Sequence, residues 1–194
     1  MGEGKSNRLV ILDRDGVLNA VVVDPEQGTI DSPMVPAQVR ILPGVPEALK
    51  RLTEAGFHLF IASNQPAAAK GKTTRANLEA THQTIVEQVS LPGVRIEGSL
   101  ICFHRSEVGC DCRKPSPKML KQALAQVPGA DPATSWMVGD GVTDVQAGRA
   151  AGLNTAFLGP LKCDICKTLK ELGAEPDVRV ESLSDFVDHL LERR

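Results

Sequence analysis

Short apolar runs that end in polar or turn-forming residues recur along this chain. An unbroken run of about four to eight apolar residues is typical of a strand buried on both faces, as in a parallel sheet. The runs predict strands at residues 9–12, 57–64, 99–103, 136–140 and 155–158. Such strands need a covering layer on each side of the sheet.

Apolar residues at helical spacing fill most of the segments between these runs. The helix predicted at 44–55 carries its stripe at Val45, Ala48, Leu49 and Leu52, and Gly56 follows as a C-terminal cap. Further helices are predicted from Thr73 or Thr74 to 89, at 116–127, from the cap Thr143 to Gly152, and at 184–194. Segment 24–36, with its prolines and Gly28, is expected to be a loop. Alternating strands and helices predict an α/β fold.

Polar side chains with catalytic potential follow several of the predicted strands. Asp13 and Asp15 come directly after the first strand, and Gly16 allows a tight turn beside a ligand. The other candidates are Ser63 and Asn64 after the second strand, Arg113 and Lys114 before a helix, and Asp140 and Asp144 near the 136–140 run. Parallel sheets bind ligands at the carboxyl ends of their strands, so these residues are expected to meet there. Together they suit metal-assisted phosphoryl transfer.

The order of these motifs resembles the haloacid dehalogenase superfamily of aspartate-nucleophile phosphatases. DxDxV lies at 13–17, a Ser at Ser63, a Lys at Lys114 and GDxxxD at 139–144, and the resemblance extends over roughly residues 9–158. It implies a doubly wound parallel sheet of the Rossmann type. The spacing between motifs leaves no room for a large cap domain, so the site is expected to be open and bordered by loops 19–36, 65–73 and 102–114.

The resemblance also implies a chemistry. Asp13 would attack phosphorus to form an aspartyl-phosphate, and Asp15 would protonate the leaving alkoxide and later deprotonate water. Ser63, Asn64 and Lys114 would contact the phosphoryl oxygens.

A magnesium site is implied by the same resemblance. Mg²⁺ would bind the carboxylates of Asp13 and Asp140 and the backbone carbonyl of Asp15. Asp144 would orient a metal-bound water or Lys114 from behind.

A second metal site is predicted in the loop at 102–112. Cys102, His104, Cys110 and Cys112 form a CxHx5CxC pattern that suits tetrahedral Zn²⁺. All four positions would be filled by protein, so the zinc should be structural and hold Arg113 and Lys114 at the mouth of the site.

Two other features have simpler interpretations. Cys163 and Cys166 form a CxxC without a matching second half, and we expect ordinary thiols there. His82 lies on or beside the apolar stripe of its helix, which favours a packed or surface histidine over a metal ligand.

The zinc loop and the capless layout narrow the resemblance to a subgroup. This subgroup contains the D-glycero-D-manno-heptose 1,7-bisphosphate 7-phosphatases, and the phosphatase portion of histidinol-phosphate phosphatase is a close relative of them. Asn64, Gln65 and Gly71 match the heptose pattern NQSGIARG, whereas Pro66-Ala67 replaces Ser-Gly and Lys70 replaces Arg. The heptose substrate is favoured, histidinol phosphate or another sugar phosphate stays open, and Arg113 is expected to grip a second phosphate or sugar hydroxyls.

Composition limits the possible classes of protein. With 194 residues, 42% of them hydrophobic, one domain over 1–194 is expected. The net charge of −2 and the absence of Tyr argue against nucleic-acid binding. No apolar stretch approaches a membrane span or a signal peptide, so we expect a cytoplasmic monomer. A phosphotransferase, a phosphate-binding protein that has lost catalysis, and a zinc-dependent interaction module are the remaining alternatives.

Overall fold

A six-stranded parallel sheet forms the centre of the computed structural model, which describes residues 7–24, 26, 28–159, 169–173 and 175–192. The spatial order of the strands is β5-β4-β1-β6-β7-β8. Their bounds are Leu9–Leu12 (β1), His58–Asn64 (β4), Ile96–Cys102 (β5), Trp136–Gly139 (β6), Asn154–Leu158 (β7) and Val178–Val180 (β8). The parallel α/β fold predicted from the apolar runs is confirmed.

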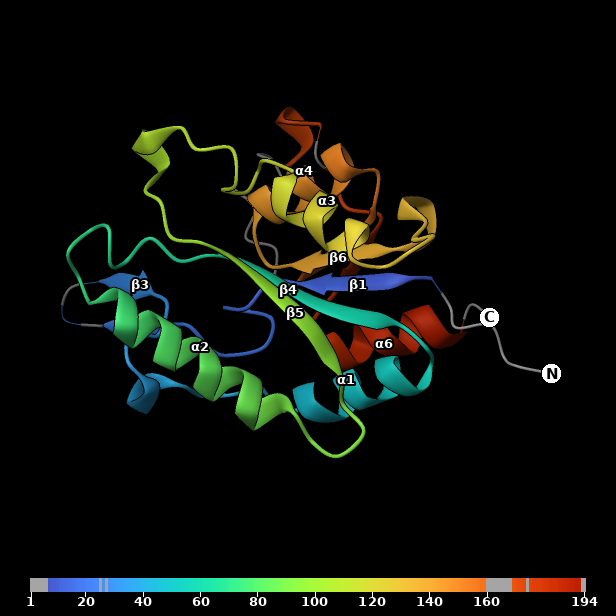
Figure 1. Cartoon of the computed structure of the whole chain (residues 1–194), viewed down its shortest axis with the longest axis horizontal. Helices are drawn as coiled ribbons and strands as arrows, with labels where there is room; N and C mark the ends of the chain where they lie inside the picture. Colours follow the sequence, from blue (N-terminus) through green and yellow to red (C-terminus); the bar gives the residue numbers. More distant parts are fainter. Residues whose placement is uncertain (1–6, 25, 27, 160–168, 174, 193–194) are drawn as a thin grey trace.

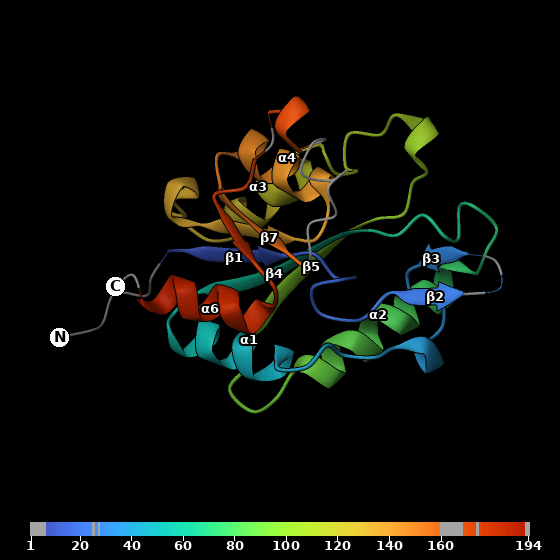
Figure 2. The same cartoon turned by 180° about the vertical axis from the view of Figure 1, so that it is seen from behind.

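Helices cover both faces of the sheet (Figures 1 and 2). One face packs against α1 (Val45–Glu54), α2 (Arg75–Val89) and α6 (Leu183–Glu192), and the other against α3 (Lys118–Ala125) and α4 (Val142–Ala151). The alternation of side chains along β1 divides its residues between the two cores, because neighbouring side chains of a strand point to opposite faces. Val10 and Leu12 pack with Leu49 of α1, whereas Leu9 and Ile11 belong to the core beside α3.

The central strand β1 places the first motif between two other strand ends. Leu12 pairs with Ile61 of β4 on one side and with Val138 of β6 on the other. The chain runs from β1 through β4 to the β5 edge and then returns to β6, so β1 and β6 flank the point where the strand order reverses. Ligands of doubly wound sheets bind at this point.

The segment predicted as a loop at 24–36 contains a strand, which corrects that prediction. Strands β2 (Val22–Asp24) and β3 (Thr29–Asp31) form an antiparallel hairpin, followed by the short 3-10 helix η1 (Pro36–Gln38). The hairpin was missed because its apolar side chains are not buried: Val23 is 61% exposed and Ile30 is 63% exposed. Burial periodicity therefore gave no signal, although β-branched residues favour extended backbone.

Several boundaries also differ from the prediction, and β8 was not predicted. β5 begins at Ile96 rather than at 99, and α3 begins at Lys118 because Pro117 precedes it as the N-cap. Gly141, not Thr143, is the N-cap of α4, where the Asp144 carboxylate accepts a hydrogen bond from the Gly141 amide. Two further 3-10 helices, η2 (Ser106–Val108) and η3 (Pro132–Thr134), lie in loops.

Three segments project beyond the carboxyl ends of the central strands: the β2–β3 hairpin, the loop after β4 and the loop after β5 (Figure 1). They are short, and within the described part of the chain no cap domain covers the sheet edge. Among the described residues no helix has the length and apolar character needed to span a bilayer. Cys163 and Cys166 lie outside the described residues.

Candidate active site

Three carboxylates meet where β1 and β6 end. Asp13 follows β1, Asp140 follows β6, and Asp144 lies in the first turn of α4; one oxygen of each lies within 4.8 Å of the others. Two glycines make this approach possible. Gly16 has φ +80°, and a Cβ there would overlap the Asp140 carboxyl; a Cβ at Gly139 would overlap Asp144.

Lys114 joins two of these carboxylates from the side of β4. Its Nζ lies 2.9 Å from Asp13 Oδ1 and 2.6 Å from Asp144 Oδ1, and it donates a hydrogen bond of 2.6 Å to the carbonyl of Ala62. Burial alone would lower the pKa of Lys114, but the charges of Asp13 and Asp144 outweigh it and raise the pKa. The lysine therefore stays protonated.

The cluster keeps an excess of negative charge. Burial, followed by the charges of Asp13 and Asp144, raises the pKa of Asp140 to about 7. Burial also raises the pKa of Asp144 to about 6, against the opposing effect of Lys114 and with a further increase from Asp13. Crowded carboxylate oxygens of this kind match the ligands that Mg²⁺ prefers. The residues present thus fit a divalent cation.

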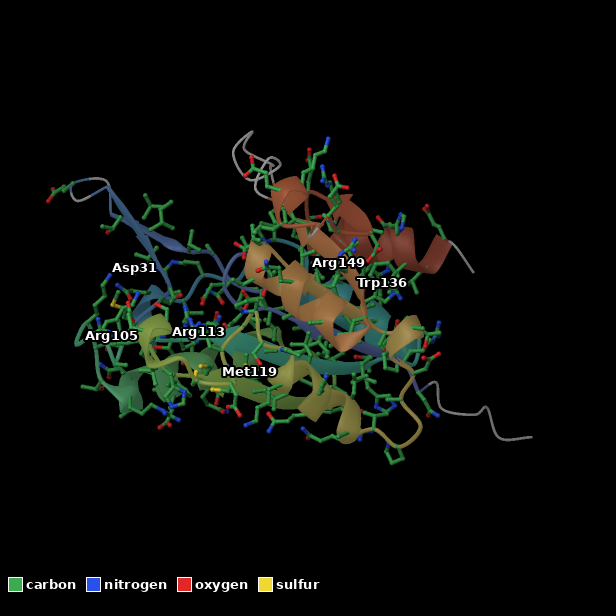
Figure 3. The ribbon with its side chains drawn as sticks, turned by 90° about the horizontal axis from the view of Figure 1, so that it is seen from above. Asp31, Arg105, Arg113, Met119, Trp136 and Arg149 are labelled. Atoms are coloured by element: carbon green, nitrogen blue, oxygen red, sulfur yellow. The ribbon has the colours of Figure 1, made fainter. Side chains whose placement is uncertain are left out.

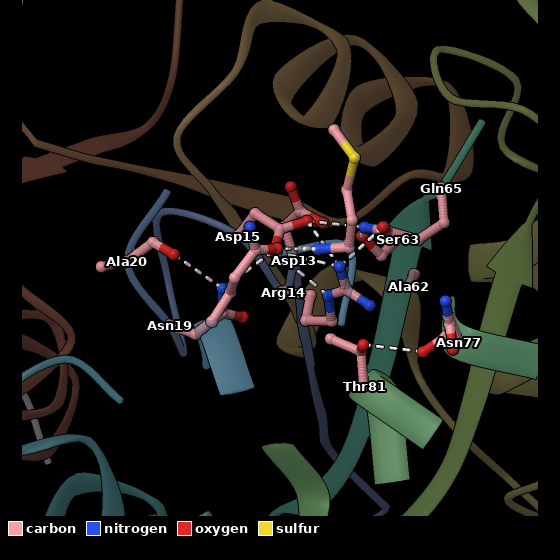
Figure 4. Close-up of polar contacts among 12 residues, drawn as sticks. Asp13, Arg14, Asp15, Asn19, Ala20, Ala62, Ser63, Gln65, Asn77 and Thr81 are labelled. Carbon is pink, nitrogen blue, oxygen red and sulfur yellow. Dashed lines mark hydrogen bonds and ion pairs between the residues drawn. The ribbon is translucent and has the colours of Figure 1, made fainter. Parts of the chain in front are cut away.

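The carboxylate of Asp15 is held separately by a set of donors (Figure 4). Asn19 Nδ2 lies 2.9 Å from Oδ1, and Gln65 Nε2 lies 2.5 Å from Oδ2. The guanidinium of Arg14 contacts both oxygens, at 3.1 Å to Oδ2 and 3.2 Å to Oδ1. Asp13 and Asp15 therefore have different environments. Asp13 lies in the carboxylate cluster, and Asp15 is surrounded by hydrogen-bond donors.

The polar side chains at the end of β4 form hydrogen bonds to other residues of the site. Ser63 is buried, and its Oγ accepts a 3.0 Å hydrogen bond from Gln65 Nε2. The Asn64 side chain bonds the backbone of Lys114 in both directions, accepting from N at 3.1 Å and donating to O at 3.1 Å. The predicted substrate-binding residues Asn64 and Gln65 thus also fix Lys114 and Asp15.

Arg14 and Asn19 are site residues that were not predicted from the sequence. Arg14 stands at the variable position between the two aspartates, and Asn19 lies in the following turn. Both are fully buried. The available signal was a cation between two carboxylates at the end of a buried strand, since a buried arginine requires an anionic or amide partner.

His82 lies partly buried on α2, as predicted for a packed histidine. Burial, and then the charge of Arg14, lowers the pKa of His82 to about 4, with Asp15 opposing. His82 therefore stays neutral near pH 7. It belongs to neither cluster of possible metal ligands found among the described residues.

The four predicted zinc ligands converge at the end of β5. Cys102 Sγ lies 3.7 Å from Cys110 Sγ and 3.3 Å from Cys112 Sγ, and His104 Nδ1 lies 3.2 Å from Cys112 Sγ. Ligands about 2.3 Å from a tetrahedral zinc lie roughly 3.8 Å from one another. The sulfur and nitrogen donors therefore have nearly the spacing that zinc requires.

Arg113 connects this cluster to the active site. It precedes Lys114, and its Nη1 donates a hydrogen bond of 3.3 Å to the carbonyl of His104. Figure 3 shows Arg113 and Arg105 at the same end of the molecule as Asp31 of the hairpin. On that side Lys72 Nζ lies 2.7 Å from Asp31 Oδ2, which ties the hairpin to the loop after β4.

Comparison with known proteins agrees with this geometry. The model of the haloacid dehalogenase-like hydrolase family matches residues 33–152. A D-glycero-beta-D-manno-heptose-1,7-bisphosphate 7-phosphatase of Pseudomonas aeruginosa is 39% identical over 145 residues, 75% of this chain and 77% of that protein. A Bordetella bronchiseptica phosphatase of the same name is 34% identical, over 95% of this chain and 98% of its own.

A solved structure extends the likeness to three dimensions. The crystal structure of D,D-heptose 1,7-bisphosphate phosphatase from B. bronchiseptica, complexed with magnesium and phosphate, superposes with a TM-score of 0.79. It is 31% identical and covers 96% of this chain and 99% of that one. The chain therefore belongs to the haloacid dehalogenase-like hydrolases, in the family of its heptose-bisphosphate phosphatase relatives, and is a phosphatase.

Proposed function

We propose that this enzyme removes the 7-phosphate of D-glycero-D-manno-heptose 1,7-bisphosphate through an aspartyl-phosphate at Asp13. The observation that carries the proposal is the separation of two aspartates: Asp13 lies beside Lys114 and Asp140, and Asp15 lies in its own ring of donors. The names of the relatives, 34–39% identical over most of their length, support the heptose substrate.

Each aspartate has one part in the proposed reaction. A carboxylate oxygen of Asp13 forms a bond to phosphorus while the bond from phosphorus to the 7-oxygen breaks, and Asp15 gives its proton to that oxygen. Water then attacks the same phosphorus, Asp15 takes its proton, and the bond to Asp13 breaks to release inorganic phosphate. Both residues return to their starting states.

Mg²⁺, bound by the carboxylates of Asp13 and Asp140 and the carbonyl of Asp15, supplies the positive charge that two anions need to approach each other. Asp144 keeps Lys114 in place by their 2.6 Å ion pair. Ser63, Asn64 and Lys114 contact the transferring phosphoryl group, and Gln65 and Arg113 contact the rest of the substrate. The planar fork of Arg113 suits the 1-phosphate.

The zinc site completes the proposal. Cys102, His104, Cys110 and Cys112 hold a structural Zn²⁺, supported by the spacing of their donor atoms. The metal fixes the start of the segment that carries Arg113 and Lys114, in a loop too short to have its own core. We expect the enzyme to act as a monomer in the cytoplasm. Sedimentation velocity would test the oligomeric state.

A panel of substrates tests the proposal. We expect kcat/KM with Mg²⁺ to be highest for one anomer of heptose 1,7-bisphosphate, lower for histidinol phosphate and lowest for common sugar monophosphates. Asp13→Asn should abolish turnover with zinc content and fold unchanged. A higher kcat/KM for histidinol phosphate would show that histidinol phosphate, and not the heptose bisphosphate, is the substrate. Zinc-loaded protein without Mg²⁺-dependent turnover would favour the zinc-dependent interaction module.

A further inference from the structure

Arg14 is a fully buried cation inside the active site. Among the described residues Asp15 is the carboxylate with which it forms an ion pair, at 3.1 Å, and Gln65 Oε1 accepts a 2.6 Å hydrogen bond from its Nη2. A buried charge is costly unless it is paired and hydrogen-bonded. A buried arginine at this position therefore indicates a function of its charge or hydrogen bonds that an apolar side chain of similar size could not provide.

The contacts of Arg14 point to that task. Its Nε and Nη2 both reach Asp15 Oδ1, and Nη2 also reaches Oδ2. Because the guanidinium is planar and rigid, these contacts fix the rotation of the carboxylate as well as its position. A lysine ammonium would supply the charge without that orientation.

Gln65 joins Arg14 to the rest of the site. Its oxygen accepts from Arg14, and its nitrogen donates to Asp15 Oδ2 at 2.5 Å and to Ser63 Oγ at 3.0 Å. The Gln65 amide can donate to Asp15 only in this orientation, and the bond from Arg14 to its oxygen selects it. Arg14 therefore acts on Asp15 directly and through Gln65 (Figure 4).

We propose that Arg14 is the positioning residue that aims the Asp15 carboxyl for proton transfer. The inference rests on the proposed function, because it takes Asp15 as the proton carrier. Without Arg14, Asp15 keeps its donors Asn19 and Gln65 but loses the rigid guanidinium that contacts both of its oxygens, and the oxygen of the Gln65 amide loses its donor. Binding of phosphate and attack by Asp13 need neither contact.

The leaving group distinguishes this role from general support of the fold. An alkoxide needs a proton as it leaves, whereas p-nitrophenolate is stable enough to leave without one. A defect in aiming Asp15 therefore slows the first turnover of an alkyl phosphate and spares that of p-nitrophenyl phosphate. The second step needs Asp15 for both substrates, so p-nitrophenolate should appear as a burst followed by slow turnover.

The experiment measures first-turnover rates by rapid quench for heptose bisphosphate and p-nitrophenyl phosphate. The variants are Arg14→Met and Arg14→Lys, with Asp15→Asn as the reference for loss of the proton carrier. Arg51→Met serves as the matched control, since Arg51 pairs with Asp188 between α1 and α6, away from Asp15. Circular dichroism and thermal unfolding establish that each variant is folded.

For Arg14→Met we expect a loss of about 30- to 100-fold with the alkyl phosphate, at or below the lower end of the roughly 100- to 10,000-fold contribution of general acid catalysis, because Asp15 is misaligned and not removed. The rate of the p-nitrophenolate burst should change by less than about threefold, and the substrate concentration that gives half of the maximal burst rate should stay the same. Arg14→Lys should show the same selectivity with a smaller loss, and it decides the question if Arg14→Met does not fold.

Equal losses with both substrates, or full activity of Arg14→Lys, would overturn the positioning role. If Asp15→Asn itself lacks the leaving-group selectivity, the proton-carrier assignment in the proposed function fails, and this inference fails with it. If Asp15→Asn shows the selectivity and the Arg14 variants do not, only the inference about Arg14 is wrong.

Discussion

Asn64 and Lys114, fifty positions apart in the chain, exchange two hydrogen bonds between the side chain of one and the backbone of the other. The amide at the end of β4 thereby sets the position of the peptide that carries the lysine. The Lys114 ammonium in turn lies between Asp13 and Asp144. Asn64, which is proposed to contact the substrate, thus also affects the surroundings of Asp13, the proposed nucleophile.

Asn64→Ala should therefore lower kcat as well as raise KM. We expect kcat to fall by about tenfold or more and the free energy of unfolding to fall by roughly 1–3 kcal/mol, because two backbone groups of Lys114 lose their partner. Asn154→Ala is the control, since Asn154 bonds the carbonyl of Ala133 far from the site. A higher KM with unchanged kcat would mean that Asn64 acts on substrate alone.

Gly16→Ala should abolish Mg²⁺-dependent activity. The substitution places a Cβ against the Asp140 carboxyl at a residue with φ +80°, so the carboxyl or the catalytic turn must move. Gly28→Ala is matched for backbone strain, because Gly28 has φ +62° with nothing within 4 Å of the added Cβ. Both variants should lose about 1 kcal/mol of stability from the positive φ. Full activity of Gly16→Ala would contradict the close approach of these two residues.

Magnesium affinity should increase with pH. The pKa values of Asp140 and Asp144 are raised to about 7 and about 6 from 3.8, so the cation must displace protons at lower pH. We expect the apparent affinity for Mg²⁺, measured by calorimetry, to rise from pH 5.5 and to level off about one pH unit above the pKa of Asp140, at roughly pH 8. An affinity independent of pH over this range would show that these carboxyls ionise normally.

The same shifts determine how the metal-free protein responds to pH. Between about pH 4 and 7 the folded protein binds more protons at Asp140 and Asp144 than the unfolded chain, so these groups lower the stability as pH rises. His82 has the opposite effect, because its pKa of about 4 lies below the usual 6.5. The stability that neutral His82 contributes is lost as the pH falls from about 6.5 to about 4. Thermal unfolding of wild type and Asp140→Asn separates the effect of the carboxyls from that of His82. The variant should lose less stability at high pH, because it lacks the Asp140 carboxyl.

Zinc removal should loosen the segment before α3. We expect Cys110→Ser to lower the zinc content from one per chain and to reduce kcat/KM, since Arg113 and Lys114 lose a fixed anchor. The control is Ser106→Ala, an exposed change in the same loop. Metal content is measured by atomic emission. Loss of zinc with unchanged kinetics and unfolding temperature would refute the structural role.

The parts of this enzyme that sequence predicts are those with strong burial or a fixed motif. The runs around Leu12 and Val138 predicted the central strands because both faces of the sheet are buried. The convergence of Cys102, His104, Cys110 and Cys112 was predicted from their spacing alone. The β2–β3 hairpin gave no periodic signal because it exposes Val23 and Ile30. Arg14 was missed because its full burial and its contact with Gln65, fifty-one positions away, arise only in the folded protein.

The place of β1 in the sheet has a consequence for local opening of the chain. Its amides lie between β4 and β6, so they should exchange hydrogen only when the whole protein unfolds. The loop carrying Lys72 and the hairpin carrying Asp31 meet through an exposed ion pair and should open at far lower free energy. Asp13 thus follows the strand expected to exchange slowest, whereas the outer segments that project beyond the strand ends are expected to exchange fastest. Substrate preference can then drift by changes in the outer loops without loosening the strand that holds Asp13.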